Sequence, residues 1–310
     1  MFIVDITLAR RKLAAITYPA HIFGTSLIYI LLGGGFLAAL GAAAGFVWPV
    51  RVFQFVYWLV VGALVYRGLR SLARVEAWAT GILMLLLVVV SLVAWKTQGW
   101  AISSLLFAWD GSAVPLGILL FSLMGLPVVG EVVELSKRDR VSAYQAVITG
   151  TLLAALLSWF FGVSWALIVL PPLSMGEAFH LPPALHIVTG LMSLVGLFAV
   201  LTSHLTSATD LLATFHRDFG FAKHYARIAA VVPPLLLLFV FKQDLLYLMN
   251  TVGALFSAFN ATLVCLMALV LALRSPLRTS WVIGVSALLT GMVFVAILLE
   301  KLVHFLSPLV

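Results

Sequence analysis

The stretch Gly117-Ile-Leu-Leu-Phe-Ser-Leu-Met-Gly-Leu-Pro-Val-Val-Gly-Glu131 decides which kind of helical protein this sequence predicts. It lies in an apolar run from about Val114 to Leu135, and a helix needs roughly 20 apolar residues to cross the hydrocarbon core of a membrane. Pro127 removes a backbone hydrogen-bond donor, and Gly125 and Gly130 weaken the helix around it. We therefore expect a membrane helix that is broken near this proline.

A broken helix at membrane depth frees backbone N–H and carbonyl groups that lipid cannot satisfy. Such breaks hold substrate in many secondary transporters, and the alternative here is an ordinary proline kink. Glu131 and Glu134 follow the break at helical spacing, just before a basic cluster. Because a carboxylate in a membrane segment is usually paired or functional, Glu131 is a candidate functional group. The alternative for both carboxylates is pairing with the neighbouring bases.

The composition of the whole chain agrees with a membrane protein. Of its 310 residues, 64% are hydrophobic and 9% are charged, whereas a soluble domain is about half apolar and a quarter charged. The net charge of +7 comes from short basic clusters between apolar runs. This pattern indicates how the chain is oriented in a membrane and does not indicate nucleic-acid binding. A single cysteine, no zinc-like Cys/His set and no Gly-rich phosphate loop leave nothing that argues for an enzyme or a resident cofactor.

We predict an all-α, polytopic protein with about nine transmembrane helices. The expected spans are Tyr18–Phe46, Val50–Tyr66, Ala77–Trp95, Val114–Leu135, Ala143–Leu170, Leu185–Ala213, Ile228–Phe241, Leu245–Leu273 and Ser280–Leu306. We treat residues 1–310 as one transmembrane domain, with a stub at 1–17 and a helical bundle at 18–310.

The positions of Lys and Arg predict the orientation of these spans. All but four of the 18 fall in alternate connections, in clusters such as Arg67, Arg70 and Arg74, and the four exceptions are Arg51, Lys96, Lys242 and Lys301. Short basic loops stay on the cytoplasmic side of a membrane. We therefore expect a multi-pass protein of the plasma (inner) membrane with a cytoplasmic stub and N-terminus and an external C-terminus.

Several polar residues lie inside the apolar runs. Residues 201–210 read Leu-Thr-Ser-His-Leu-Thr-Ser-Ala-Thr-Asp; such hydroxyls can coordinate a cation, although they also bond their own helix backbone. For His204 we expect a structural or helix-contact role. The hydroxyl of Tyr29 needs a partner at mid-membrane and is a candidate to face a cavity. Glycines 33–35 are expected to allow close helix packing, and a weaker polar face is marked by Asn250, Ser257 and Asn260.

These residues resemble the amino acid/polyamine/organocation superfamily, particularly permeases similar to the tryptophan/tyrosine type. Residues 118–131 look like the sixth helix of that family, with Phe121, Ser122, Gly125 and Glu131 matching its broken centre and Gly130 where proline is usual. Residues 197–203 resemble the eighth helix, 244–256 the tenth and 29–37 the third. The family normally has eleven spans. The likeness begins at the third of them, so the first broken helix of the family has no counterpart in this sequence.

The resemblance implies a partial inverted-repeat transporter fold and secondary transport of amino acids, hydrophobic or aromatic, coupled to a proton (H+) or sodium (Na+) gradient. It implies an amino acid substrate and a lipid bilayer as partners, with no nucleic acid, and leaves the oligomeric state open. The implied substrate-binding residues are Tyr29, Phe121, Ser122, Met124, Gly125, Leu126 and Pro127. Thr202 and Ser203 resemble a cation-site hydroxyl pair, and Glu131 is a further ion-coupling candidate.

Two other functions remain as alternatives at this point. The first is a truncated, transport-incompetent protein that persists as a membrane interaction protein, which the absence of the first broken helix favours. The second is an anion channel, which would require a basic residue facing a pore at mid-membrane, and the apolar runs offer none there.

Overall fold

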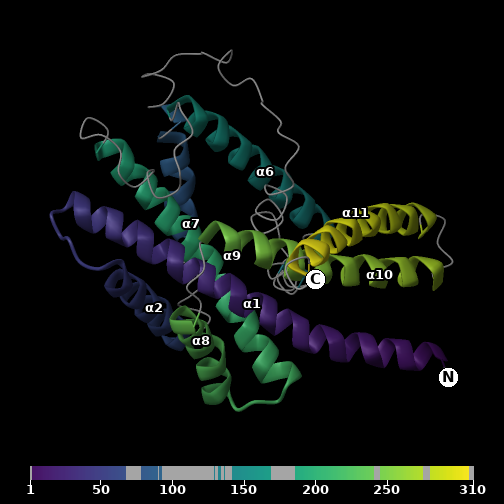
Figure 1. Ribbon diagram of the computed structural model, residues 1–310. Coiled ribbons are helices and arrows are strands. Elements are labelled where there is room, and N and C mark those ends of the chain that lie inside the picture. Colours follow the sequence, from purple (N-terminus) through teal and green to yellow (C-terminus); the bar gives the residue numbers. More distant parts are fainter. Residues whose placement is uncertain are drawn as a thin grey trace. The chain divides into compact units, whose positions relative to one another are not determined.

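A computed structural model describes residues 2–67, 78–89, 91–92, 129, 132–133, 136, 142–168, 186–240, 245–274 and 280–306 (Figure 1). Within these residues all regular structure is helical, as predicted. The helices are α1 (Phe2–Ala43), α2 (Val50–Arg67), α6 (Ala143–Ile168), α7 (His186–Ala213), α8 (Lys223–Val240), α9 (Leu245–Thr251), α10 (Ala258–Arg274) and α11 (Ser280–Leu306). Two π-helical turns, η4 (Thr214–Asp218) and η5 (Val252–Ser257), follow α7 and join α9 to α10.

Seven helices in the described part are long and apolar enough to cross a membrane, so the chain is a polytopic helical membrane protein. They are Ala15–Ala43, Val50–Arg67, Ala143–Phe160, Ser193–Asp218, Lys223–Val240, Leu245–Arg274 and Trp281–Val303. Each overlaps one of the nine predicted spans. Of the other two, residues 77–95 contain a shorter apolar helix, Trp78–Val89, and residues 114–135 lie almost entirely outside the described residues. The count of nine therefore stays a prediction.

The described helices form two compact units, and the single transmembrane domain suggested by the sequence stays a prediction. The first unit contains α1 up to Ile28 together with α9, η5, α10 and α11. The second contains α1 from Tyr29 onward together with α2, α6, α7, η4 and α8. Helix α1 begins at Phe2, so the helix extends through the predicted stub instead of starting with the first span.

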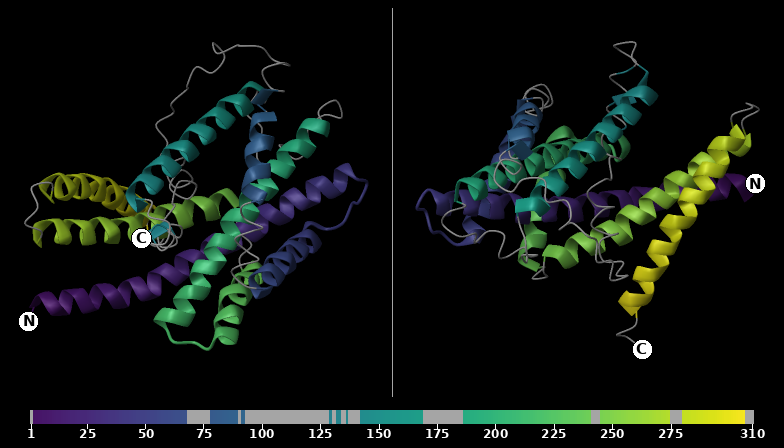
Figure 2. Two further views of the ribbon diagram at one scale, coloured as in Figure 1. Left: turned by 180° about the vertical axis from the view of Figure 1, so that it is seen from behind. Right: turned by 90° about the horizontal axis from the view of Figure 1, so that it is seen from above.

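In the first unit, α10 and α11 pack side by side as an antiparallel pair (Figure 2). Small residues set their separation: a Cβ atom on Gly291 would lie 3.2 Å from Cβ of Cys265, and one on Gly284 would lie 3.4 Å from Cβ of Ala272. Small residues at helix contacts are how membrane helices approach closely without a hydrophobic driving force. The remaining surface of α11 exposes apolar side chains, as expected of a helix that faces lipid.

In the second unit, glycines bring α1 against α2. A Cβ atom on Gly33 would overlap the ring of Tyr57, and one on Gly34 would lie 2.6 Å from Cα of Gln54. This confirms the packing role predicted for these two glycines. Helix α2 also packs on α7 and α8, and the indole Nε1 of Trp58 donates a hydrogen bond to the Val231 carbonyl at 2.8 Å.

Candidate functional site

Polar side chains from α1, α2 and α7 gather inside the second unit. The hydroxyl of Tyr29 hydrogen-bonds with the hydroxyls of Ser203 and Ser207, which lie one helical turn apart on α7. Ser207 is buried and Ser203 is exposed. The partner that Tyr29 was expected to need is therefore the polar stripe of residues 201–210, and Ser203 is the member of this group that remains accessible.

The ring of His204 lies between two tyrosines. Its centroid is 5.7 Å from that of Tyr29 and 5.7 Å from that of Tyr57, with interplanar angles of 44° and 27°. His204 is 4% exposed and Tyr57 is 2% exposed. The hydrogen-bonding atoms Nδ1 of His204 and Oη of Tyr57 have no partner among the described residues. A buried polar atom without a partner costs about 1–3 kcal/mol, so these two atoms require an explanation.

The two predicted ion-coupling hydroxyls differ in their contacts. Thr202 Oγ1 donates to carbonyls of its own helix, at 3.1 Å to Phe198 and 3.0 Å to Ala199. This is the back-bonding that threonine commonly makes within helices. Ser203 instead bonds with Tyr29 of a different helix. Both oxygens keep lone pairs, so a cation role for the pair stays a prediction.

The structure describes only part of the predicted site. Tyr29, Thr202 and Ser203 lie in described helices, and Tyr29 and Ser203 are brought together. The remaining predicted residues lie outside the described residues, and they are Phe121, Ser122, Met124, Gly125, Leu126, Pro127 and Glu131.

Sequence reasoning missed Tyr57 and gave His204 only a structural role. Two signals pointed to Tyr57. Its hydroxyl lies in a mostly apolar span, and the glycines at 33–35 leave room for a side chain of a neighbouring helix. The pairing itself depends on the register of α1 and α2, which sequence does not provide. The contact of His204 with two aromatic rings agrees with the expected helix-contact role.

A second polar cluster lies in the first unit, where α1 meets η5. The Nε2 atom of His21 lies 3.0 Å from the Ser257 hydroxyl, and Thr17 Oγ1 donates to Asn260 Oδ1 at 3.3 Å. A Cβ atom on Gly24 would lie 2.9 Å from the Val252 side chain. These contacts align α1 antiparallel to the η5 segment.

The turn η5 interrupts the α-helical pattern in the middle of a membrane span, and single π-helical turns are frequent at functional sites. His21 Nδ1 and Asn260 Nδ2 have no hydrogen-bond partner in the described part of the chain. Ser257 and Asn260 thus belong to the polar face predicted for this span. His21, a histidine inside an apolar run, was missed.

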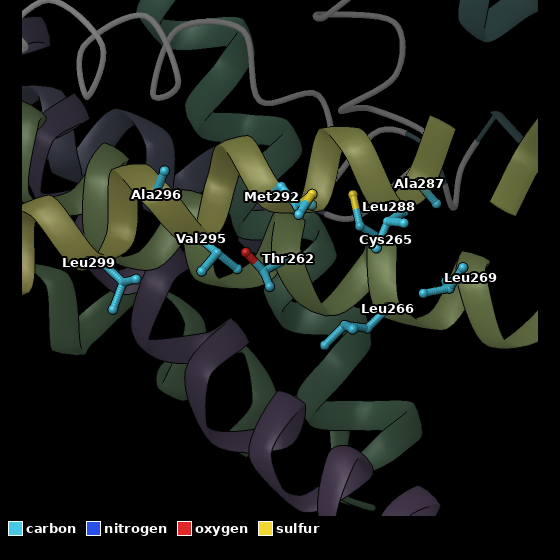
Figure 3. A pocket seen from close by; sticks show the side chains of 11 residues that line it. Thr262, Cys265, Leu266, Leu269, Ala287, Leu288, Met292, Val295, Ala296 and Leu299 are labelled. Carbon is cyan, nitrogen blue, oxygen red and sulfur yellow. The ribbon is translucent and has the colours of Figure 1, made fainter. Parts of the chain in front are cut away.

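A pocket of about 360 Å³ lies between α10 and α11, and Figure 3 shows Thr262, Cys265 and Met292 among its lining side chains. Its lining is otherwise aliphatic, and the Thr262 hydroxyl donates to the Ala258 carbonyl of its own helix at 2.8 Å. A site for a polar ligand needs a few convergent polar groups. This pocket is therefore not the candidate site for a charged substrate.

The candidate site is thus the cluster of Tyr29, Tyr57, Ser203, His204 and Ser207, which combines hydroxyls, an imidazole and aromatic faces. Among the described residues, no group of three His, Cys, Asp or Glu side chains is placed to hold a metal ion. No protein-family model matches the chain, and none of the curated proteins compared with it matches either.

Proposed function

We propose that this chain is a secondary active transporter of hydrophobic or aromatic amino acids, driven by a proton or sodium gradient. The observation that carries the proposal is the polar cluster in the second unit, where Tyr29 bonds with Ser203 and Ser207 and where buried polar atoms of His204 and Tyr57 have no hydrogen-bond partner among the described residues. Polar groups inside a membrane protein are costly, and they commonly mark the path of a substrate or an ion.

The chemistry of the cluster suits an amino acid. An ammonium group needs acceptors and a carboxylate needs donors, and the hydroxyls of Tyr29, Ser203 and Ser207 serve as either. The neighbouring rings of Tyr29, His204 and Tyr57 supply an apolar surface, which is what a hydrophobic or aromatic side chain packs against. The choice of amino acids as the substrate class rests on the resemblance of residues 118–131 and 197–203 to amino acid permeases.

In this proposal the backbone around Phe121–Pro127 holds the amino acid, Tyr29 closes over it, and Thr202 and Ser203 help to bind the coupling cation. Glu131 stabilises the broken helix or carries a proton. The hydrogen bond between Tyr29 and Ser203 then links the substrate residue on α1 to the cation residue on α7. Such a link offers a route by which substrate and ion binding influence each other.

The proposal is tested by uptake of labelled tryptophan, tyrosine, leucine and glutamate into liposomes that contain the purified full chain. A proton gradient and a sodium gradient are imposed separately, so the active gradient identifies the coupling ion. We expect uptake of the first three amino acids under one of the gradients. We expect Ser203→Ala to lower uptake about fivefold to tenfold, as loss of one hydrogen bond of about 1 kcal/mol or slightly more predicts.

Ser286→Ala is the matched control, because Ser286 is exposed on α11 and, among the described residues, its hydroxyl bonds only the Val282 carbonyl of its own helix, at 2.8 Å. Uptake by this variant should equal that of the unmodified chain. Absence of uptake under both gradients would overturn the proposal and favour a membrane interaction protein that does not transport.

A further inference from the structure

The connection between α7 and α8 is a closed turn with a defined shape. Gly220 adopts a φ of +71°, the left-handed conformation that ends many helices. The N–H of Phe221 donates to the Phe215 carbonyl at 3.0 Å, and the N–H of Phe219 donates to the Thr214 carbonyl at 3.2 Å. These bonds satisfy the carbonyls of the first two residues of η4. The side chains of this turn are therefore held in fixed positions at one end of the second unit.

Three phenylalanines of this turn form an aromatic cluster. The rings of Phe215 and Phe221 stack with centroids 5.6 Å apart, and Phe219 lies 5.7 Å from Phe215 and 6.4 Å from Phe221. Phe219 and Phe221 are each 42% exposed. Exposed apolar rings at the end of a membrane span are typical of side chains that insert at the boundary between headgroups and acyl chains.

Next to this cluster, the last turn of α2 meets the first turn of α8. The Tyr66 hydroxyl lies 2.7 Å from Nδ1 of His224, and the guanidinium carbon of Arg227 lies 5.0 Å from the centre of the Tyr66 ring. The second contact is a cation–π interaction. It places the basic residues at the end of α2 and at the start of α8 on the same side of the second unit.

The charges at this place lack compensation. Arg67 ends α2, and Lys223 and Arg227 lie in the first two turns of α8. Within the described residues none of the three pairs with an acidic side chain, and Nε of Arg227 is buried without a hydrogen-bond partner. Asp218 contributes one nearby negative charge in the sequence. Cations near a helix N-terminus also oppose the helix dipole, which favours anions there. A bound anion would relieve both unfavourable terms.

We propose that Arg67, Lys223 and Arg227, with the Tyr66 hydroxyl, bind the phosphate of an anionic lipid headgroup, while the cluster of Phe215, Phe219 and Phe221 inserts beside its acyl chains. The shared chemistry of possible ligands is a phosphate oxyanion. A lipid is the source that the surface fits, because the basic residues end two membrane spans and border exposed apolar rings. The inference does not depend on the transport function.

The test uses the purified, delipidated full chain and measures lipid binding by native mass spectrometry. The probes are phosphatidylglycerol and phosphatidylcholine with identical acyl chains, and inorganic phosphate is the soluble competitor. We expect tighter binding of phosphatidylglycerol and no competition by phosphate at equal concentration. Lys223→Gln and Arg227→Gln should each weaken phosphatidylglycerol binding about fivefold, which corresponds to about 1 kcal/mol for one basic residue near an anionic surface. Arg227→Lys should recover most of the loss.

Arg51→Gln is the matched control, because Arg51 is exposed at the opposite end of α2 and the substitution removes the same charge. Binding by this variant should be unchanged. Because Lys223 is exposed, its variant keeps the test valid if Arg227→Gln fails to fold. Equal binding of the two lipids, or equal losses in Arg51→Gln and Lys223→Gln, would overturn the proposal. Full competition by inorganic phosphate would overturn the assignment to a lipid.

Discussion

The imidazole Nε2 of His21 lies 3.0 Å from the hydroxyl of Ser257, a contact between residues 236 positions apart in the sequence. Both side chains are buried, and the contact joins α1 to the π-helical turn η5. In lipid such a bond joins two helices by polar contact where no hydrophobic driving force exists.

Replacing Ser257 with alanine should therefore lower the stability of the protein. The change leaves Nε2 of His21 buried without a partner, and we expect a loss of about 1 kcal/mol of unfolding free energy, within the range for hydrogen bonds between membrane helices. Denaturant unfolding in mixed micelles measures it. Ser286→Ala, which removes a self-bonded hydroxyl on an exposed face, should have no effect. Equal stability of the two variants would show that the His21 contact contributes nothing.

Replacing Gly34 with alanine should be destabilising, because an added Cβ would lie 2.6 Å from Cα and 2.7 Å from the backbone nitrogen of Gln54. Backbone atoms cannot rotate away, so α1 and α2 must separate, and overpacking of this kind costs about 1–3 kcal/mol. Gly150→Ala in α6 is the control, since no described atom lies within 4 Å of its added Cβ. Thermal unfolding should show a lower transition for Gly34→Ala and an unchanged or higher one for Gly150→Ala.

Tyr57 and Tyr29 should respond differently to replacement by phenylalanine. Tyr57→Phe removes a hydroxyl without a described partner, so we expect no loss of stability but a loss of uptake if that hydroxyl serves the substrate. Tyr29→Phe removes the bonds with Ser203 and Ser207, so both stability and uptake should fall. Paired measurements of melting temperature and uptake distinguish the two. A Tyr57→Phe variant with normal uptake would remove this residue from the proposed site.

Cys265, the chain's single cysteine, lies in the apolar pocket between α10 and α11 and should face hydrocarbon. A nitroxide attached there in liposomes should collide more often with oxygen, which concentrates in lipid, than with a water-soluble nickel chelate. In the double variant Cys265→Ala, Tyr225→Cys, the label lies at a 66% exposed position in the first turn of α8, and the chelate should reach it more readily. Greater chelate access at Cys265 would contradict the membrane placement of α10.

The positions of the spans were predictable because each depends only on local sequence. Residues 245–273 contain no charged side chain and are mostly apolar, and the structure has one continuous helical segment there, Leu245–Arg274. The π-helical turn η5 within it was not predicted, because the shift of hydrogen bonds at residues 252–257 leaves no compositional mark. Predicted orientation and substrate class depend on the charge pattern and on the family likeness, and they stay predictions.

By itself the sequence determined that this protein lies in lipid and that it is helical. Lipid satisfies no backbone hydrogen bond, so long apolar runs in membrane must form helices that satisfy their own. Only the tertiary structure decided which polar side chains meet, as Tyr29 meets Ser203 and Ser207 and His204 lies between Tyr29 and Tyr57. These contacts depend on the depth and register at which the helices pack. Close approaches between residues distant in the chain, such as that of Gly33 to Tyr57, set this depth and register.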